Sequence, residues 1–168
     1  SNRIILVNSD YTKKIAYKIY ARFKKKIIKL PFLPYNFTDH VKIDFKILKA
    51  KYKIKKNFFI ISNQFWKHKN HKIAFEAFRQ IVKVYPDYQL ICTGDLNDSR
   101  HPIHTQNLFK RYKDLIINNK ILILGIISKS EQISLIKKSR AVIQPTVYEG
   151  GPGGFSVYEA IAFKKKII

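Results

Sequence analysis

Short apolar runs alternate with segments of helical periodicity from Asn57 to the end of the chain. The runs expected to be strands cover 58–62, 89–93, 121–125, 141–145 and 166–168, and the segments expected to be helices cover 70–84, 104–118, 130–138 and 155–163. Strands and helices that alternate in this way form a parallel sheet through right-handed crossovers. We therefore predict an α/β fold with helices on both faces of the sheet. In the helix over 70–84, the predicted buried stripe consists of Ile73, Phe75, Ala77, Phe78, Ile81 and Val82.

A smaller strand–helix–strand unit precedes this region. Apolar runs at 4–7 and 26–30 flank a helical pattern at 11–23, and the polar residues at 8–10 are of types that cap helices. Two prolines and a run of alternating lysine and apolar residues follow, up to residue 57. We predict the end of an N-terminal domain over 1–35, an interdomain linker over 36–57 and a C-terminal domain over 58–168. The chain reads as a piece of a longer protein, cut at both ends.

Glycine is concentrated in one segment, between the strand expected at 141–145 and the helix expected at 155–163. The chain has six glycines, and four of them lie in this segment: Gly150, Gly151, Gly153 and Gly154. Bare backbone can approach a phosphate closely, and the N–H groups that open a helix, here at Phe155 and Ser156, attract anions. A plain loop that needs positive φ angles is the alternative, although one or two glycines would satisfy it. Ligands of parallel α/β sheets also bind at the carboxyl ends of the strands, where this segment lies.

Two glutamates bracket the glycine segment. The chain contains four glutamates in all, and two of them are Glu149 and Glu159. A carboxylate accepts two hydrogen bonds from a vicinal diol, so Glu159 is suited to hold a ribose. Glu149 would be repelled by a diphosphate and is expected to face sugar hydroxyls or a positive neighbour. The alternative for Glu159 is an exposed helix position that pairs with a following lysine.

Two other strand ends carry polar residues toward the same edge. The first loop offers Gln64, Lys67 and Lys69, where a lysine can neutralise a phosphate as a point charge or simply be a solvated residue at the start of a helix. The second loop offers Gly94 and Arg100, with Arg100 near a phosphate or a base. The histidine pair at 68 and 71 lacks a third ligand of suitable type nearby. The aspartate pair at 95 and 98 resembles a divalent-metal pair, but a polar loop is the favoured interpretation, so we predict no metal site.

The strong positive charge of the chain bears on which anionic partners it could bind. The chain has 33 Lys and Arg against 11 Asp and Glu, a formal net charge of +22. Nucleic acids bind basic surfaces by counterion release, and anionic membranes attract them, so both are open as partners. The basic excess extends over both halves of the chain, as expected for a solvated lysine-rich exterior. We expect no nucleic-acid partner. The single cysteine, Cys92, is typical of a reducing compartment.

Together these segments resemble the C-terminal domain of the family-four retaining glycosyltransferases, which have the GT-B fold of two Rossmann-like domains. The resemblance covers about 58–168 and is carried by 58–77 with its Lys69-Asn70, by Cys92-Thr93-Gly94, by Leu124-Gly125, by Gln144-Pro145-Thr146 and by 149–160. Residues 1–35 resemble the final strand–helix–strand of the preceding domain in that fold.

The resemblance implies a role for each of the main site residues. Lys69 corresponds to a lysine that binds the donor diphosphate, Glu149 to the catalytic-site glutamate that faces the transferred sugar, and Glu159 to the glutamate that holds the ribose. The sequence departs from the family pattern in two places. Gln64 replaces an arginine five residues before the lysine, for which Lys67 is a candidate substitute, and nine residues instead of seven separate the two glutamates.

The implied activity is transfer of a sugar from a nucleotide-sugar donor with retention of the anomeric configuration. It needs no metal and no cofactor, because a helix dipole and a lysine stabilise the departing diphosphate. The acceptor, a saccharide or a lipid-linked group, would be bound by the missing N-terminal part, so the piece alone is expected to be inactive. Surface-polysaccharide synthesis in the cytoplasm, with peripheral contact at the inner face of an anionic membrane, is the expected setting. Alternatives are a GT-B nucleotide-sugar epimerase or phosphorylase, or a basic nucleic-acid-binding module.

Overall fold

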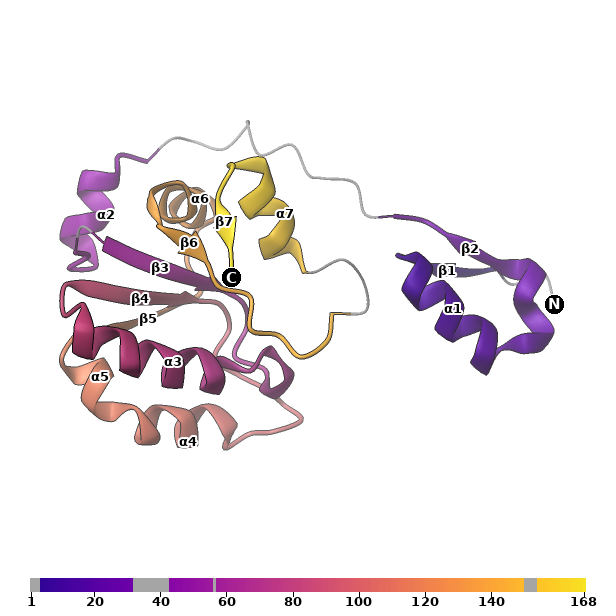
Figure 1. Ribbon diagram of the computed structural model, residues 1–168, viewed down its shortest axis with the longest axis horizontal. Coiled ribbons are helices and arrows are strands. Elements are labelled where there is room, and N and C mark those ends of the chain that lie inside the picture. The colour runs from indigo at the N-terminus through magenta and orange to yellow at the C-terminus, as the bar shows by residue number, and fades with distance from the viewer. Residues whose placement is uncertain (1–3, 32–42, 56, 150–153) are drawn as a thin grey trace.

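The computed structural model describes residues 4–31, 43–55, 57–149 and 154–168. Along the chain lie β1 (Ile5–Val7), α1 (Asp10–Ile19), the 3-10 helix η1 (Ala21–Lys26), β2 (Ile27–Lys29), α2 (Phe45–Lys51), β3 (Asn57–Ser62), the 3-10 helix η3 (Lys67–Lys69), α3 (His71–Val84), β4 (Tyr88–Thr93), α4 (His104–Arg111), α5 (Lys113–Ile117), β5 (Ile121–Gly125), α6 (Lys129–Lys138), β6 (Ala141–Val142), α7 (Phe155–Ala162) and β7 (Lys166–Ile167). Figure 1 shows the arrangement of these elements.

The larger unit is built on a five-stranded sheet in the order β5-β4-β3-β6-β7. Every neighbouring pair of strands is parallel, as the alternation of strands and helices predicts. Each crossover carries at least one helix, so parallel strands can follow one another in the chain without a hairpin. The predicted α/β class with a parallel sheet and helices on both faces is therefore confirmed (Figure 1).

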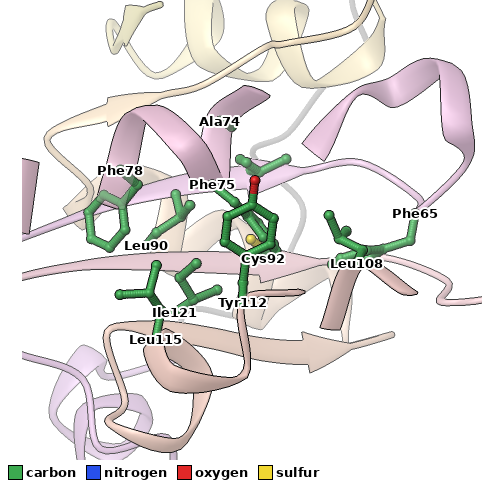
Figure 2. Packing of buried hydrophobic residues seen from close by; sticks show 11 residues of the cluster. Phe65, Ala74, Phe75, Phe78, Leu90, Cys92, Leu108, Tyr112, Leu115 and Ile121 are labelled. Carbon is green, nitrogen blue, oxygen red and sulfur yellow. The ribbon is translucent and has the colours of Figure 1, made fainter. Parts of the chain in front are cut away.

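Helices α3, α4 and α5 cover one face of the sheet. Alternate residues of the strands, among them Ile61, Leu90 and Ile121, point to this face and are buried. They pack against Phe75 and Phe78 from α3 and against side chains of α4 and α5. Figure 2 shows this cluster, with the sulfur of Cys92 among the aromatic rings. Burial raises the pKa of the Cys92 thiol, which makes it an inert core residue.

Helices α2, α6 and α7 cover the other face. Here the intervening strand residues Phe58, Ile60 and Ile91 pack against Leu135 of α6 and Ala160 of α7. Leu48 of α2 and Ile54 belong to the same cluster and are buried. The two faces of the sheet are thus both apolar, which explains why its strands read as nearly continuous apolar runs.

Residues 43–54 belong structurally with the larger unit, although they fall inside the range 36–57 predicted to be linker. The alternation of lysine and apolar residues is produced by helix α2, which begins at the N-cap Asp44 and buries Leu48. Lys51 and Tyr52 also bind the side chain of Glu131 in α6. Residues 32–42 lie outside the described part of the chain, so the division into domains at 35 and 57 stays a prediction.

The N-terminal unit is a single β–α–β crossover. Strands β1 and β2 are parallel, and α1 connects them through η1. Ser9 is the N-cap of α1 and accepts a hydrogen bond from the Thr12 N–H. Val7, Ala16 and Ile27 form a small buried cluster between the strands and the helix.

The predicted buried face of the helix over 70–84 is wrong in two positions. Ile73 is 59% exposed and Ala77 is also exposed, whereas His71 and Ala74 are buried with Phe75 and Phe78. The helix is therefore rotated so that its first residue enters the core, where the His71 ring stacks on Phe65 at 4.1 Å between centroids. The predicted helix over 104–118 is also divided at Tyr112, whose side chain is fully buried.

Candidate functional site

A cavity of about 610 Å³ opens at the carboxyl ends of the strands. Its described lining comes from the ends of β3, β4 and β5 and the residues that follow them, from η3, from the loop before α7, and from the N-terminal turns of α6 and α7: Ser62, Asn63, Gln64, Lys69, Thr93, Gly94, Ile126, Ile127, Lys129, Gln132, Glu149, Gly154, Phe155, Ser156 and Glu159. This volume falls in the range of roughly 300–1,000 Å³ that is usual for small-molecule sites. The position is the one that the rule for parallel α/β sheets predicts.

The N-terminus of α7 faces this cavity. Gly154 is its N-cap, with no side-chain capping bond, and Gly154, Phe155 and Ser156 all line the cavity. A helix N-terminus carries a partial positive charge and outward-pointing N–H groups, so it favours an anion. A Cβ added at Gly154 would lie 3.2 Å from a carboxylate oxygen of Glu149, so the glycine lets that carboxylate approach the helix end. Of the predicted glycine segment, Gly150, Gly151 and Gly153 lie outside the described residues.

Glu149 is held in the cavity wall by a lysine and an amide. Its Oε1 forms an ion pair with the Lys69 ammonium, and both side chains are largely buried. The same oxygen accepts a hydrogen bond of 3.2 Å from Gln144 Nε2. Gln144 Oε1 in turn accepts from Asn63 and from the Ser156 hydroxyl, which joins the ends of β3, β6 and α7. Lys69 is thus the positive neighbour of Glu149, one of the two surroundings expected for this glutamate from the sequence.

Glu159 is almost completely buried, at 2% exposure, in the second turn of α7. Its Oε1 forms an ion pair with the Lys129 ammonium, and its Oε2 accepts from Gln132 Nε2 at 3.2 Å. Gln132 also donates to the Ser62 hydroxyl at the end of β3. The partners come from α6 rather than from the lysines that follow α7, so the alternative of an exposed helix pair is wrong.

Gly94 fixes the path of the chain at the cavity floor. Its φ is +131°, and a Cβ there would lie 2.4 Å from the Asn63 carbonyl oxygen. Its N–H donates to the Gly125 carbonyl at 2.8 Å. A glycine is required because both the backbone angle and the contact exclude a side chain. This close approach brings the ends of β3, β4 and β5 together under the cavity.

Lys67 and Arg100 are not among the described residues that line the cavity. Lys67 is exposed, and its N–H donates to the Asp98 carboxylate. Arg100 pairs with the same carboxylate and lies over the Trp66 ring at 5.0 Å. Asp98 is therefore a loop-organising acceptor, and its pKa is lowered by the Lys67 N–H and by Arg100. Gln64 does line the cavity and is exposed there.

Lys129 and Gln132 are the functional candidates that the sequence analysis missed. They lie at the start of α6, after the end of β5, and the strand-end rule applies to that loop as well as to the others. Lysine is so abundant in this chain that Lys129 carries no signal by itself. Within the described residues, no group of three or more His, Cys, Asp or Glu side chains is placed to hold a metal ion.

The start of α6 is itself fixed by Glu131. The Ser128 side chain caps the helix, and the Glu131 carboxylate accepts a hydrogen bond from the Ser128 N–H, which completes a capping box. Glu131 also accepts from Lys51 Nζ at 2.8 Å and Tyr52 OH at 3.0 Å. These partners, Lys51 first, lower the pKa of Glu131 to about 2. The ion pair with α2 thereby holds the turn that presents Lys129 and Gln132.

The sequence model of one family, described as glycosyl transferases group 1, matches residues 44–168. The chain belongs to this family. The match begins at the N-cap of α2, in agreement with the packing of that helix on the sheet. A search of curated proteins found no significant match.

Solved glycosyltransferases share the fold at low sequence identity. A glycosyltransferase from Rickettsia africae ESF-5 is 20% identical, with a TM-score of 0.76 over 99% of this chain and 44% of that one. HepE from Anabaena, in complex with UDP and glucose, is 16% identical, with a TM-score of 0.77 over 98% of this chain and 43% of that one. The same protein with UDP-glucose is 17% identical, with a TM-score of 0.75 over 98% and 43%.

This chain therefore has the sheet and helix arrangement of GT-B glycosyltransferase C-terminal domains, with a further β–α–β unit before it in the sequence. It spans less than half the length of these solved structures. None of the helices in the described part of the chain is long and apolar enough to cross a bilayer.

Proposed function

We propose that this chain is the donor-binding half of a family-four retaining glycosyltransferase and that its cavity binds a nucleotide-diphosphate sugar. The observation that carries the proposal is the gathering of a helix N-terminus, two lysines and two largely buried glutamates around one cavity at the strand ends. Lysines and helix N–H groups bind phosphate oxygens, and carboxylates bind sugar hydroxyls. A nucleotide-diphosphate sugar carries both kinds of group in one molecule.

The family resemblance supports a role for each residue. Lys69 and the N-terminus of α7 bind the diphosphate, Glu149 faces the transferred sugar, and Glu159 holds the ribose. Gly94 and Gly154, with Phe155 and Ser156, supply the close backbone surface for the nucleotide. In the reaction, the acceptor oxygen replaces the diphosphate oxygen at C1 of the sugar with retention of configuration. The lysine and the helix dipole stabilise the charge that develops on the diphosphate, so neither a metal nor a cofactor is required.

The donor is proposed to be a uridine or guanosine diphosphate hexose. HepE, which has the same fold, is described in complex with UDP and with UDP-glucose. A saccharide or lipid-linked acceptor would bind to a preceding domain of the GT-B pair, in the cytoplasm at the inner face of a membrane, in surface-polysaccharide synthesis. The 168-residue chain is accordingly expected to bind the donor without transferring its sugar.

Isothermal titration tests the proposal directly. UDP, GDP and a short oligonucleotide are titrated separately into the 168-residue chain. We expect one of the two nucleoside diphosphates to bind with 1:1 stoichiometry. Salt-sensitive binding of the oligonucleotide without binding of either nucleotide would reject a donor site and favour a basic nucleic-acid-binding module.

A further inference from the structure

The charges that line the cavity balance each other as two ion pairs. Among its described lining residues, Lys69 pairs with Glu149 and Lys129 pairs with Glu159. A nucleoside diphosphate brings additional negative charge that this balanced set does not neutralise. An ammonium group that exchanges part of its carboxylate contact for phosphate would supply positive charge to such a ligand.

Both pairs lie close to the N-terminal turns of α7, in the lining of one cavity. Glu149 lies beside the N-cap, because its carboxylate oxygen is 3.2 Å from the Cβ position of Gly154. Glu159 lies in the next turn of the same helix, and residues three or four apart share one face of a helix within about 5–6 Å. An anion at this N-terminus would therefore share the cavity with the side chains of both Lys69 and Lys129.

The position of Lys129 is fixed by the start of its helix and by its side-chain partners. It is the first residue of α6, next to the capping box formed by Ser128 and Glu131. Its ammonium also donates to Gln132 Oε1 at 3.0 Å, and its side chain is about one-third exposed, toward the cavity that it lines. A flexible four-carbon stem lets the ammonium move from a carboxylate to a nearby phosphate without any movement of the backbone.

We propose that Lys129 is a second phosphate-binding cation of the donor site, which releases the carboxylate of Glu159 to the ribose hydroxyls when it engages the diphosphate. The inference rests on the proposed donor function and adds a residue from the β5–α6 junction to it. In the free protein, Lys129 neutralises the buried carboxylate, and in the complex it neutralises the ligand. The leaving diphosphate then has two lysines, Lys69 and Lys129, from different strand ends.

The test compares a diphosphate with its nucleoside. NMR titration of the 168-residue chain gives the dissociation constants of UDP and uridine, and of GDP and guanosine, for wild type, Lys129→Met and Lys129→Arg. Because one charge-assisted phosphate contact is lost, Lys129→Met should weaken diphosphate binding about 10-fold to 100-fold and change nucleoside binding less than about 3-fold. Lys129→Arg should keep most of the diphosphate preference. Lys138→Met, an exposed lysine at the other end of α6, is the matched control and should change neither constant.

Two results would overturn the inference while the donor function stands. An equal loss for diphosphate and nucleoside would mean that Lys129 only positions Glu159 or contacts the base. Unchanged binding of both in Lys129→Met would mean that it touches neither. If wild type binds neither UDP nor GDP, the proposed function fails, and this inference fails with it.

Discussion

Replacement of Gly94 by alanine is expected to damage both the stability of the sheet and the shape of the cavity. The φ of Gly94 is +131°, outside the range that residues with a Cβ adopt without strain, and such a conformation costs about 1–3 kcal/mol. The new Cβ would also lie 2.4 Å from the Asn63 carbonyl oxygen and 2.8 Å from the Gln64 backbone nitrogen. Overpacking of this kind adds about 1–3 kcal/mol. We therefore expect Gly94→Ala to lower the free energy of unfolding by about 2–6 kcal/mol.

Gly125 provides the matched control. It also has a positive φ, of +66°, but a Cβ there would meet no atom within 4 Å. Gly125→Ala should therefore cost only the backbone strain, about 1–2 kcal/mol. Urea unfolding of both variants, followed by circular dichroism, gives the two free energies and shows through the m-value whether the folded state is retained. If Gly94→Ala costs no more than Gly125→Ala, the steric argument for the cavity floor is wrong.

Three further predictions concern a buried histidine, a helix start and the ribose contact. Burial, with smaller contributions from His104 and Lys69, lowers the pKa of His71 to about 3. A histidine in the unfolded chain binds its proton below about pH 6.5, whereas buried His71 stays neutral, so the free energy of unfolding should fall by about 2 kcal/mol between pH 7 and pH 5. Urea unfolding of His71→Phe should show a smaller fall over the same pH range. An equal fall in the variant would contradict this. Glu131→Gln should lower the free energy of unfolding by about 1–3 kcal/mol in the same assay, because it removes the charge that binds Lys51 and Tyr52. The control Asp87→Asn, at an exposed position, should change it by less than about 0.5 kcal/mol. Similar effects of the two substitutions would refute a structural role for Glu131. Glu159→Gln should weaken UDP or GDP binding about 10-fold in isothermal titration, and unchanged binding would move the ribose contact elsewhere.

The elements with strong hydrophobic periodicity could be predicted from the sequence, and helix α2 could not. In α2, lysines alternate with apolar residues, and this pattern fits a strand or an extended linker as well as a short helix. Its placement depends on Leu48 and Ile54 entering a core formed by residues far along the chain. The buried face of α3 could not be predicted for a related reason, since His71 is polar yet packs between aromatic rings.

The carboxylates of the site could be found from the sequence, whereas one of their lysines could not. Glu149 and Glu159 are conspicuous because acidic residues are rare in this chain, and the strand–glycine–helix order indicates a ligand site next to them. Lys129 lies 30 residues before its partner Glu159, and only the packing of α6 beside α7 brings them together. A lysine in so basic a chain carries no information until its neighbours in space are known.

NMR chemical-shift mapping tests most directly whether a nucleotide binds in the cavity at the N-terminus of α7. UDP and GDP are titrated into the isotopically labelled chain while the backbone amides are followed. We expect the amides of Gly94, Lys129, Gly154 and Ser156 to shift on addition of the nucleotide that binds, while those of α4, which contributes no residue to the described cavity lining, do not shift. Shifts confined to the β1–α1–β2 unit or to α4, with no change at the start of α7, would contradict it.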